Sequence, residues 1–109
     1  MTEILILAVY LPGNDQPLLG GFVLVEEGSD DYAIVFRRHW AQLCDLEDAE
    51  VLDGMEQALQ DLARHGPIGN FLSEMENRFS NVIRCLERIK LPNTVSLDDR
   101  RSLLERALI

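Results

Sequence analysis

The chain contains few of the residues from which cross-links and metal centres are built. Only two cysteines, Cys44 and Cys85, stand among its 109 residues, too few for a disulfide framework. Each lies among apolar neighbours, so we expect two buried free thiols, with a Cys44–Cys85 bridge as the alternative. The two histidines, His39 and His65, form no H-x-x-x-H pair, and no C-x-x-C pair is present. The sequence therefore predicts no metal site.

Long hydrophobic runs and phosphate-binding loops are also missing. The longest apolar run, residues 4–11, has eight residues, whereas a membrane-spanning helix needs roughly 20. Glu3 stands where a signal peptide carries basic residues, and no small-residue cleavage site follows. No G-x-G-x-x-G loop occurs, and no Lys-Ser/Thr pair follows residues 66–69. We therefore expect a soluble, cytoplasmic protein without a nucleotide or other cofactor.

Positive charge is scarce and unevenly placed. The chain has 19 acidic and 10 basic residues, a formal net charge of −9, which disfavours direct binding to nucleic acid. Residues 1–77 hold 15 acids and 3 bases (−12), whereas residues 78–109 hold 4 acids and 7 bases (+3). Two interpretations follow. Either the basic C-terminal third folds back and neutralises the acidic part, or the acidic part binds a basic partner in trans.

The apolar pattern predicts one α+β domain spanning residues 1–109. With 47% hydrophobic and 27% charged residues, the composition is typical of a globular protein. Short β-branched runs at 2–11, 21–27 and 32–37 indicate an antiparallel meander, whose first strand is apolar enough to be covered on both faces. Gly20 and Gly21 indicate a bulge or a close approach at the start of the second strand.

The second half of the chain predicts helices and a late strand. Residues 38–43 suggest a short helix, and two longer helices follow, one starting at an Asp45 N-cap with a stripe from Leu52 to Leu62 and one over 68–79. Residues 80–91 alternate as a strand that faces the core on one side, although a helix is the alternative. Ser96 caps a final helix. We expect a small antiparallel sheet, three N-terminal strands plus this late strand, with three to four helices packed on one face.

An uninterrupted acidic helix is the most distinctive feature of the sequence. Seven carboxylates and no Lys or Arg lie between Asp45 and Asp61, although surface helices usually interleave charges of both signs. An ordinary solvated face is one interpretation. Under the other, the face binds a basic partner through these residues: Asp48, Glu50, Asp53, Glu56 and Asp61. The single tryptophan, Trp40, is either a core residue beneath the helices or an anchor of that interface.

Several short stretches resemble a family of small bacterial proteins of unknown function, sometimes encoded beside HipA-like kinases. The matching segments are residues 9–13, 19–24, 79–83 and the Leu-Leu-Glu-Arg helix at 98–108. Where the family has Arg, Asp and Asn, this chain has Val9, Gly13 and Leu19, so only the order of elements carries over. The resemblance implies a strand over 80–91 and a partner-dependent role, with no established activity.

Taken together, these features predict a non-enzymatic interaction module. We expect an inhibitor, an immunity protein or an accessory subunit that binds a larger, basic bacterial protein. A structural homo-oligomer, such as a homodimer, is the alternative, and a small enzyme that pairs Cys44 or Cys85 with His39 or His65 is a third hypothesis. If residues such as Arg84, Arg88, Arg100 and Arg101 bound the helical carboxylates within the chain, the case for a partner would disappear.

Overall fold

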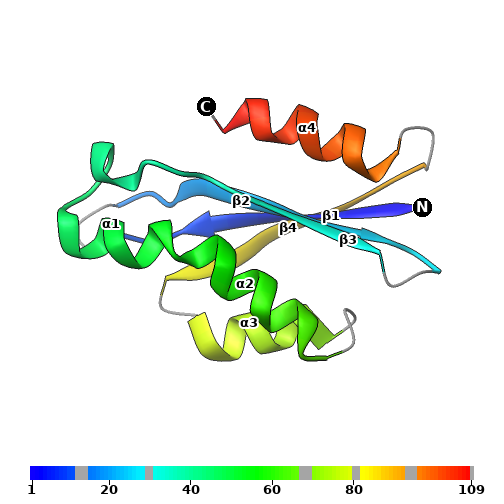
Figure 1. The fold of residues 1–109 in the computed structure, drawn as a ribbon, viewed down its shortest axis with the longest axis horizontal. Helices are drawn as coiled ribbons and strands as arrows, with labels where there is room; N and C mark the ends of the chain where they lie inside the picture. Colours follow the sequence, from blue (N-terminus) through cyan, green and yellow to red (C-terminus); the bar gives the residue numbers. More distant parts are fainter. Residues whose placement is uncertain (12–14, 29–30, 67–69, 80–81, 93–95, 109) are drawn as a thin grey trace.

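The fold is a four-stranded antiparallel sheet with helices on both faces (Figure 1). The computed structural model describes residues 1–11, 15–28, 31–66, 70–79, 82–92 and 96–108. The strands follow the order β3-β2-β1-β4 across the sheet. The elements in chain order are β1 (Thr2–Val9), β2 (Leu18–Glu26), β3 (Tyr32–Phe36), the 3₁₀ turn η1 (Trp40–Gln42), α1 (Leu46–Asp53), α2 (Met55–Arg64), α3 (Phe71–Phe79), β4 (Ile83–Leu91) and α4 (Leu97–Ala107). The predicted α+β class is confirmed.

Strand β1 lies at the centre of the core because both of its faces are covered. Leu5, Leu7 and Val9 face the larger hydrophobic cluster, which contains the buried residues of α1, α2 and α3. Ile4 faces the smaller cluster, which contains Leu108. Alternate residues of a strand point to opposite faces, so a strand without polar alternation needs cover on both sides. The expectation for this strand is confirmed.

The expectation that all helices pack on one face is wrong for α4. Leu97, Leu104 and Leu108 pack against Ile4 and Phe22 on the face opposite α1, α2 and α3. Figure 1 shows α4 on one side of the sheet and the other helices on the other side. An amphipathic stripe predicts that a helix buries one side, but the stripe does not determine which face of the sheet the helix covers.

Strand β4 exists as predicted, but it does not face one core throughout. Ile6 pairs with Glu87 and Leu7 with Cys85, so Leu86 is one extra residue in β4. Such a β-bulge shifts the alternation by one residue and exchanges the two faces of the strand. Cys85 therefore packs on the α1–α3 side, whereas Leu91 packs on the α4 side. The sequence alternates across this point without a signal for the bulge.

The paired glycines in β2 allow a close approach of strands, as predicted. The register between β1 and β2 shifts at Leu7 and Ala8, where Gly20 is the extra residue. A Cβ atom on Gly20 would lie 2.5 Å from Val9 Cγ2, and one on Gly21 would lie 2.2 Å from the Val35 carbonyl oxygen. No side chain fits at either distance.

The long acidic helix is divided in two. The Asp45 side chain accepts a hydrogen bond from the Asp48 backbone N–H and caps α1, as predicted. Helix α1 ends at Asp53 and α2 begins at Met55, so Gly54 lies between two helices instead of inside one. Glycine has low helix propensity, which accounts for the interruption at this residue. Ser96 caps α4 by accepting from the Asp99 backbone N–H, also as predicted.

Candidate functional site

The outward side of α1 combines apolar and acidic side chains. Ala49 and Leu52 point into the core. On the exposed side lie Leu46, which is 76% exposed, and Val51, which is 58% exposed, with Leu43 beside them at the end of η1. These three are half of the exposed large hydrophobic side chains in the described part of the chain. We define the α1 surface by Leu43, Leu46, Glu47, Asp48, Glu50 and Val51.

The carboxylates of this surface have no ionic partner in the described part of the chain. Among the described residues, no basic group lies within 4.0 Å of Glu47, Asp48 or Glu50, which we call the α1 carboxylates. Glu47 and Asp48 stand in the first turn of α1, where the helix dipole favours negative charge. Glu50 lies beyond that turn. The α1 surface therefore combines negative charge with exposed apolar side chains.

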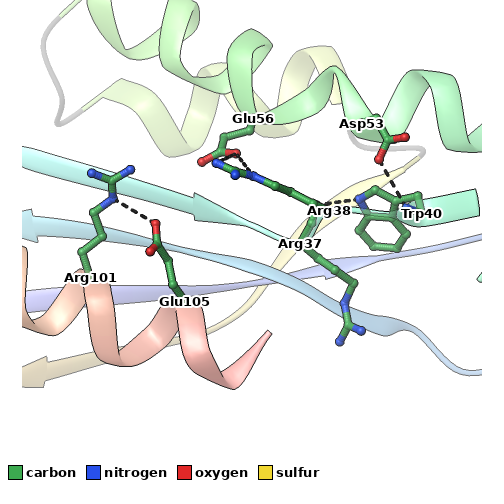
Figure 2. Close-up of polar contacts among 7 residues, drawn as sticks. All are labelled: Arg37, Arg38, Trp40, Asp53, Glu56, Arg101 and Glu105. Carbon is green, nitrogen blue, oxygen red and sulfur yellow. Dashed lines mark hydrogen bonds and ion pairs between the residues drawn. The ribbon is translucent and has the colours of Figure 1, made fainter. Parts of the chain in front are cut away.

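The other three predicted contact residues have partners of their own. Asp53 Oδ1 accepts a hydrogen bond from the Trp40 backbone N–H at 3.3 Å (Figure 2). Glu56 pairs with Arg38 at 3.4 Å. Asp61 accepts from Gln57 at 3.0 Å and lies 3.5 Å from an Arg64 nitrogen. The predicted acidic set thus falls into two groups. The side chains of Asp48 and Glu50 have no basic partner among the described residues, whereas Asp53 accepts a backbone hydrogen bond and Glu56 and Asp61 each lie near an arginine.

Trp40 is a core residue, which confirms the first of the two interpretations of its sequence position; the other, an interface anchor, is wrong. Its side chain is 0% exposed, and its ring lies 5.7 Å from the Phe36 ring, centroid to centroid. The indole Nε1 donates to the Arg37 carbonyl oxygen at 2.8 Å. An indole that is packed and hydrogen-bonded in this way offers no surface to a partner. The physical reason is that η1 turns the residue inward, beneath the helices.

The basic residues of the C-terminal segment contact groups other than the carboxylates of α1 and α2. Arg88 pairs with Glu3 at 2.6 Å and Arg101 with Glu105 at 3.5 Å. Arg100 donates to the Pro92 carbonyl oxygen, and the Arg84 guanidinium lies 5.1 Å from the centroid of the Tyr10 ring. None of these contacts reaches α1 or α2. In the described part of the chain, the ion pairs of the C-terminal third therefore form along β4 and within α3 and α4, and none involves a carboxylate of α1 or α2.

The two thiols are half-buried, free and engaged with backbone oxygens. Cys44 Sγ donates to the Trp40 carbonyl at 3.3 Å, and Cys85 Sγ donates to the Glu87 carbonyl at 3.5 Å. Burial raises the pKa of both thiols, and the Asp48 carboxylate raises the pKa of Cys44 further. A higher pKa leaves less thiolate near neutral pH, which is the opposite of the activation that a nucleophilic cysteine needs. The Cys44–Cys85 bridge is not formed.

The two histidines are exposed. His65 caps the C-terminus of α2, with Nδ1 at 2.5 Å from the Asp61 carbonyl oxygen. His39 has φ 60° and ψ 45°, the only positive φ at a non-glycine residue in the described part of the chain. This left-handed residue turns the chain from β3 into η1. Both residues therefore lie at the surface, at the start of η1 and at the end of α2.

Comparisons with known proteins add no relative. No family model matches this chain, and neither does any curated protein or any solved structure. In the described residues, no three His, Cys, Asp or Glu side chains gather where a metal ion could be held. No helix within those residues has the length and apolarity to cross a membrane.

Sequence reasoning missed the apolar part of the α1 surface. The stripe over Leu52, Met55 and Leu59 points inward as expected. Val51 and Leu46 do not belong to that stripe, since they lie one and six residues before Leu52. A helical projection of the segment would have placed both among the carboxylates.

Proposed function

We propose that the protein is a non-enzymatic module that binds a basic protein through its α1 surface. Inhibitors, immunity proteins and accessory subunits of a larger bacterial protein act in this way. One observation carries the proposal: the α1 carboxylates have no basic group within ion-pairing distance among the described residues, and exposed Leu46 and Val51 lie on the same helix. A partner supplying Lys or Arg beside apolar side chains would satisfy both halves of this surface.

The physics of association supports this combination. Opposite charges accelerate encounter and select against wrong partners, whereas buried apolar side chains supply much of the affinity. The surface is exposed, so each new ion pair contributes about 0.2–1 kcal/mol. Three such pairs together correspond to about a 3-fold to 150-fold change in affinity.

A homo-oligomer through the sheet edge has less support. Strand β4 lies at one edge of the sheet and carries Arg84, Arg88 and Lys90. Charged side chains and a bulge along an edge strand both oppose pairing with another strand. The bulge at Leu86 and these three residues therefore disfavour contact between two β4 edges.

A peptide-display selection tests the proposal while the partner is still unidentified. Random peptides are selected on the immobilised protein, and the best are synthesised and titrated at low and high salt. We expect peptides that combine Lys or Arg with apolar residues. We expect weaker binding at high salt and loss of affinity when all three α1 carboxylates become amides.

Two matched variants make the test specific. The charge control changes three exposed acids elsewhere to amides, Glu74, Glu76 and Asp98, and shifts the net charge equally. The apolar comparison is between Leu46→Ser on α1 and Leu103→Ser on α4. Leu103 is the control because its side chain is also exposed, at 59%, but lies outside the α1 surface. If both charge variants weaken binding alike, attraction to the whole molecule explains the result and the α1 surface is not the site. Selected peptides without excess positive charge would also overturn the proposal.

A further inference from the structure

A cavity opens at the end of β3, beside η1 and α2. Its volume is about 430 Å³, within the range of small-molecule and side-chain sites. The apolar lining comes from both layers of helices and from the strand between them: Val35, Phe36, Leu43 and Leu108. Leu43 also belongs to the α1 surface, so the cavity and the surface are continuous.

Two carboxylates line this cavity from opposite sides of the sheet. Glu56 belongs to α2, which covers one face, and Glu105 belongs to α4, which covers the other. Figure 2 shows both beside the strand, each drawn with its own arginine. An apolar floor between two carboxylates suits an alkyl chain that ends in a cation, because the chain contacts the floor while the charged head stays near oxygen acceptors and water.

The cations now at these carboxylates are loosely held. Arg38 Nε and Nη2 both lie 3.4 Å from the same oxygen of Glu56, and the Arg38 side chain is 70% exposed. Arg101 Nε lies 3.5 Å from Glu105, without a hydrogen bond to it. Charge-assisted hydrogen bonds are normally 2.7–2.9 Å, so both contacts are long. An incoming cation could therefore displace them at little cost.

We propose that this cavity receives an arginine or lysine side chain of the basic partner. The inference rests on the proposed function and extends it: the α1 surface attracts the partner, and the cavity holds one of its cationic side chains between Glu56 and Glu105. Arg38 occupies part of this position in the free protein and gives it up on binding. Arg37 and His39 also line the cavity. Arg37 Nε donates to the Leu19 carbonyl oxygen at 3.0 Å, and Figure 2 shows this side chain pointing away from both carboxylates, so it does not compete for them. The net charge of −9 then favours a cationic occupant over an anionic one.

A titration followed by amide NMR tests the cavity directly. The probes are the acetylated and amidated tripeptides Gly-Arg-Gly and Gly-citrulline-Gly, which differ in charge but hardly in shape, and free spermidine. We expect Gly-Arg-Gly to shift the amides of residues 35–39, 42, 43 and 108 saturably, with a dissociation constant on the order of millimolar, and the citrulline peptide to shift them little. Equal shifts from the two peptides, or shifts elsewhere, would overturn the proposal. Tighter binding of spermidine than of Gly-Arg-Gly would overturn the assignment to a protein side chain and indicate a free polyamine.

Substitutions should change this affinity in opposite directions. Glu105→Gln and Glu56→Gln each remove an acceptor and should weaken Gly-Arg-Gly binding about two-fold to five-fold. Arg38→Gln removes the competing cation and should strengthen binding by a similar factor. The control Glu74→Gln removes an exposed charge on α3 and should change nothing. An Arg38→Gln variant that binds as weakly as Glu56→Gln would show a structural effect and refute the exchange.

The cavity proposal and the proposed function can be tested separately. Converting the three α1 carboxylates to amides should weaken binding of the displayed peptides by about 3-fold to 150-fold. It should leave the Gly-Arg-Gly titration within about two-fold, since that charge is screened and outside the cavity. If the displayed peptides depend on α1 and the tripeptide does not bind, the cavity proposal fails alone. If the tripeptide binds and α1 has no effect, the α1 proposal fails alone.

Discussion

Asp53 separates a folding role from a docking role within the acidic segment. The sequence assigns it to the contact surface, whereas the structure makes it the acceptor for the backbone N–H of fully buried Trp40, at 3.3 Å. Asp53→Ala removes that acceptor and leaves the N–H without a partner. Asp53→Asn keeps an oxygen in the same position and removes only the charge. The pair of variants therefore isolates the hydrogen bond.

The expected magnitude follows from three effects. A hydrogen bond to a charged group contributes about 1.5–3 kcal/mol, and a distance of 3.3 Å in an exposed carboxylate places this one at or below the lower end. Loss of a negative charge at the C-terminus of α1 stabilises the fold by about 0.3–1 kcal/mol. Asp53→Ala should thus destabilise the fold by about 1 kcal/mol, and Asp53→Asn should be neutral or slightly stabilising.

Urea unfolding followed by circular dichroism measures the difference. With a denaturant slope of about 2 kcal/mol per molar, 1 kcal/mol lowers the midpoint by about 0.5 M. Glu50→Ala is the reference, because Glu50 is exposed on the same helix without a basic partner, and it should stay within about 0.5 kcal/mol of wild type. The reasoning is refuted if Asp53→Ala is as stable as Glu50→Ala, or if Asp53→Asn loses as much as Asp53→Ala.

Two further predictions concern the backbone and the thiols. Gly21→Ala places Cβ 2.2 Å from a backbone oxygen of β3 and should cost about 1–3 kcal/mol or more, whereas Gly54→Ala, with 3.7 Å to its nearest atoms, should add about 0.5–1 kcal/mol. Urea midpoints check both, and a Gly21→Ala midpoint equal to wild type contradicts the strand packing. Because burial raises the pKa of Cys44 and Cys85, iodoacetamide should modify the native protein near neutral pH more slowly than the urea-unfolded chain, with rates rising as the pH approaches the raised pKa. Equal or faster modification of the native protein would reveal an activated thiolate and support the enzyme hypothesis.

Local signals account for the elements that the sequence predicts correctly. The β-branched runs around Ile4, Val23 and Ile34 form strands, and the caps Asp45 and Ser96 start helices, because each depends only on neighbouring residues. The face that receives α4 depends on a second apolar side of the sheet, around Phe22, which the pattern of the helix does not encode. Tertiary packing decides that placement.

The same distinction applies to the site. The absence of Lys and Arg from the acidic segment is visible in the sequence, but the partners of Asp53 and Glu56 come from residues before it in the chain. Glu105 is 49 positions from Glu56 and faces the same cavity only because α2 and α4 cover opposite faces of one edge strand. No spacing rule brings such residues together.

Fewer acidic residues therefore support docking than the net charge of the chain suggests. Part of the acidity is neutralised within the sheet, by Arg88 and Lys90 of β4, and Glu47 and Asp48 are favoured by the dipole of α1 itself. Glu50 gains nothing from that dipole. Exposed Val51 has low helix propensity and contributes little to the core. If folding were the only requirement, other residues could stand at positions 50 and 51 without loss of stability. The functional argument therefore depends on Glu50 and on the exposed apolar side chains beside it.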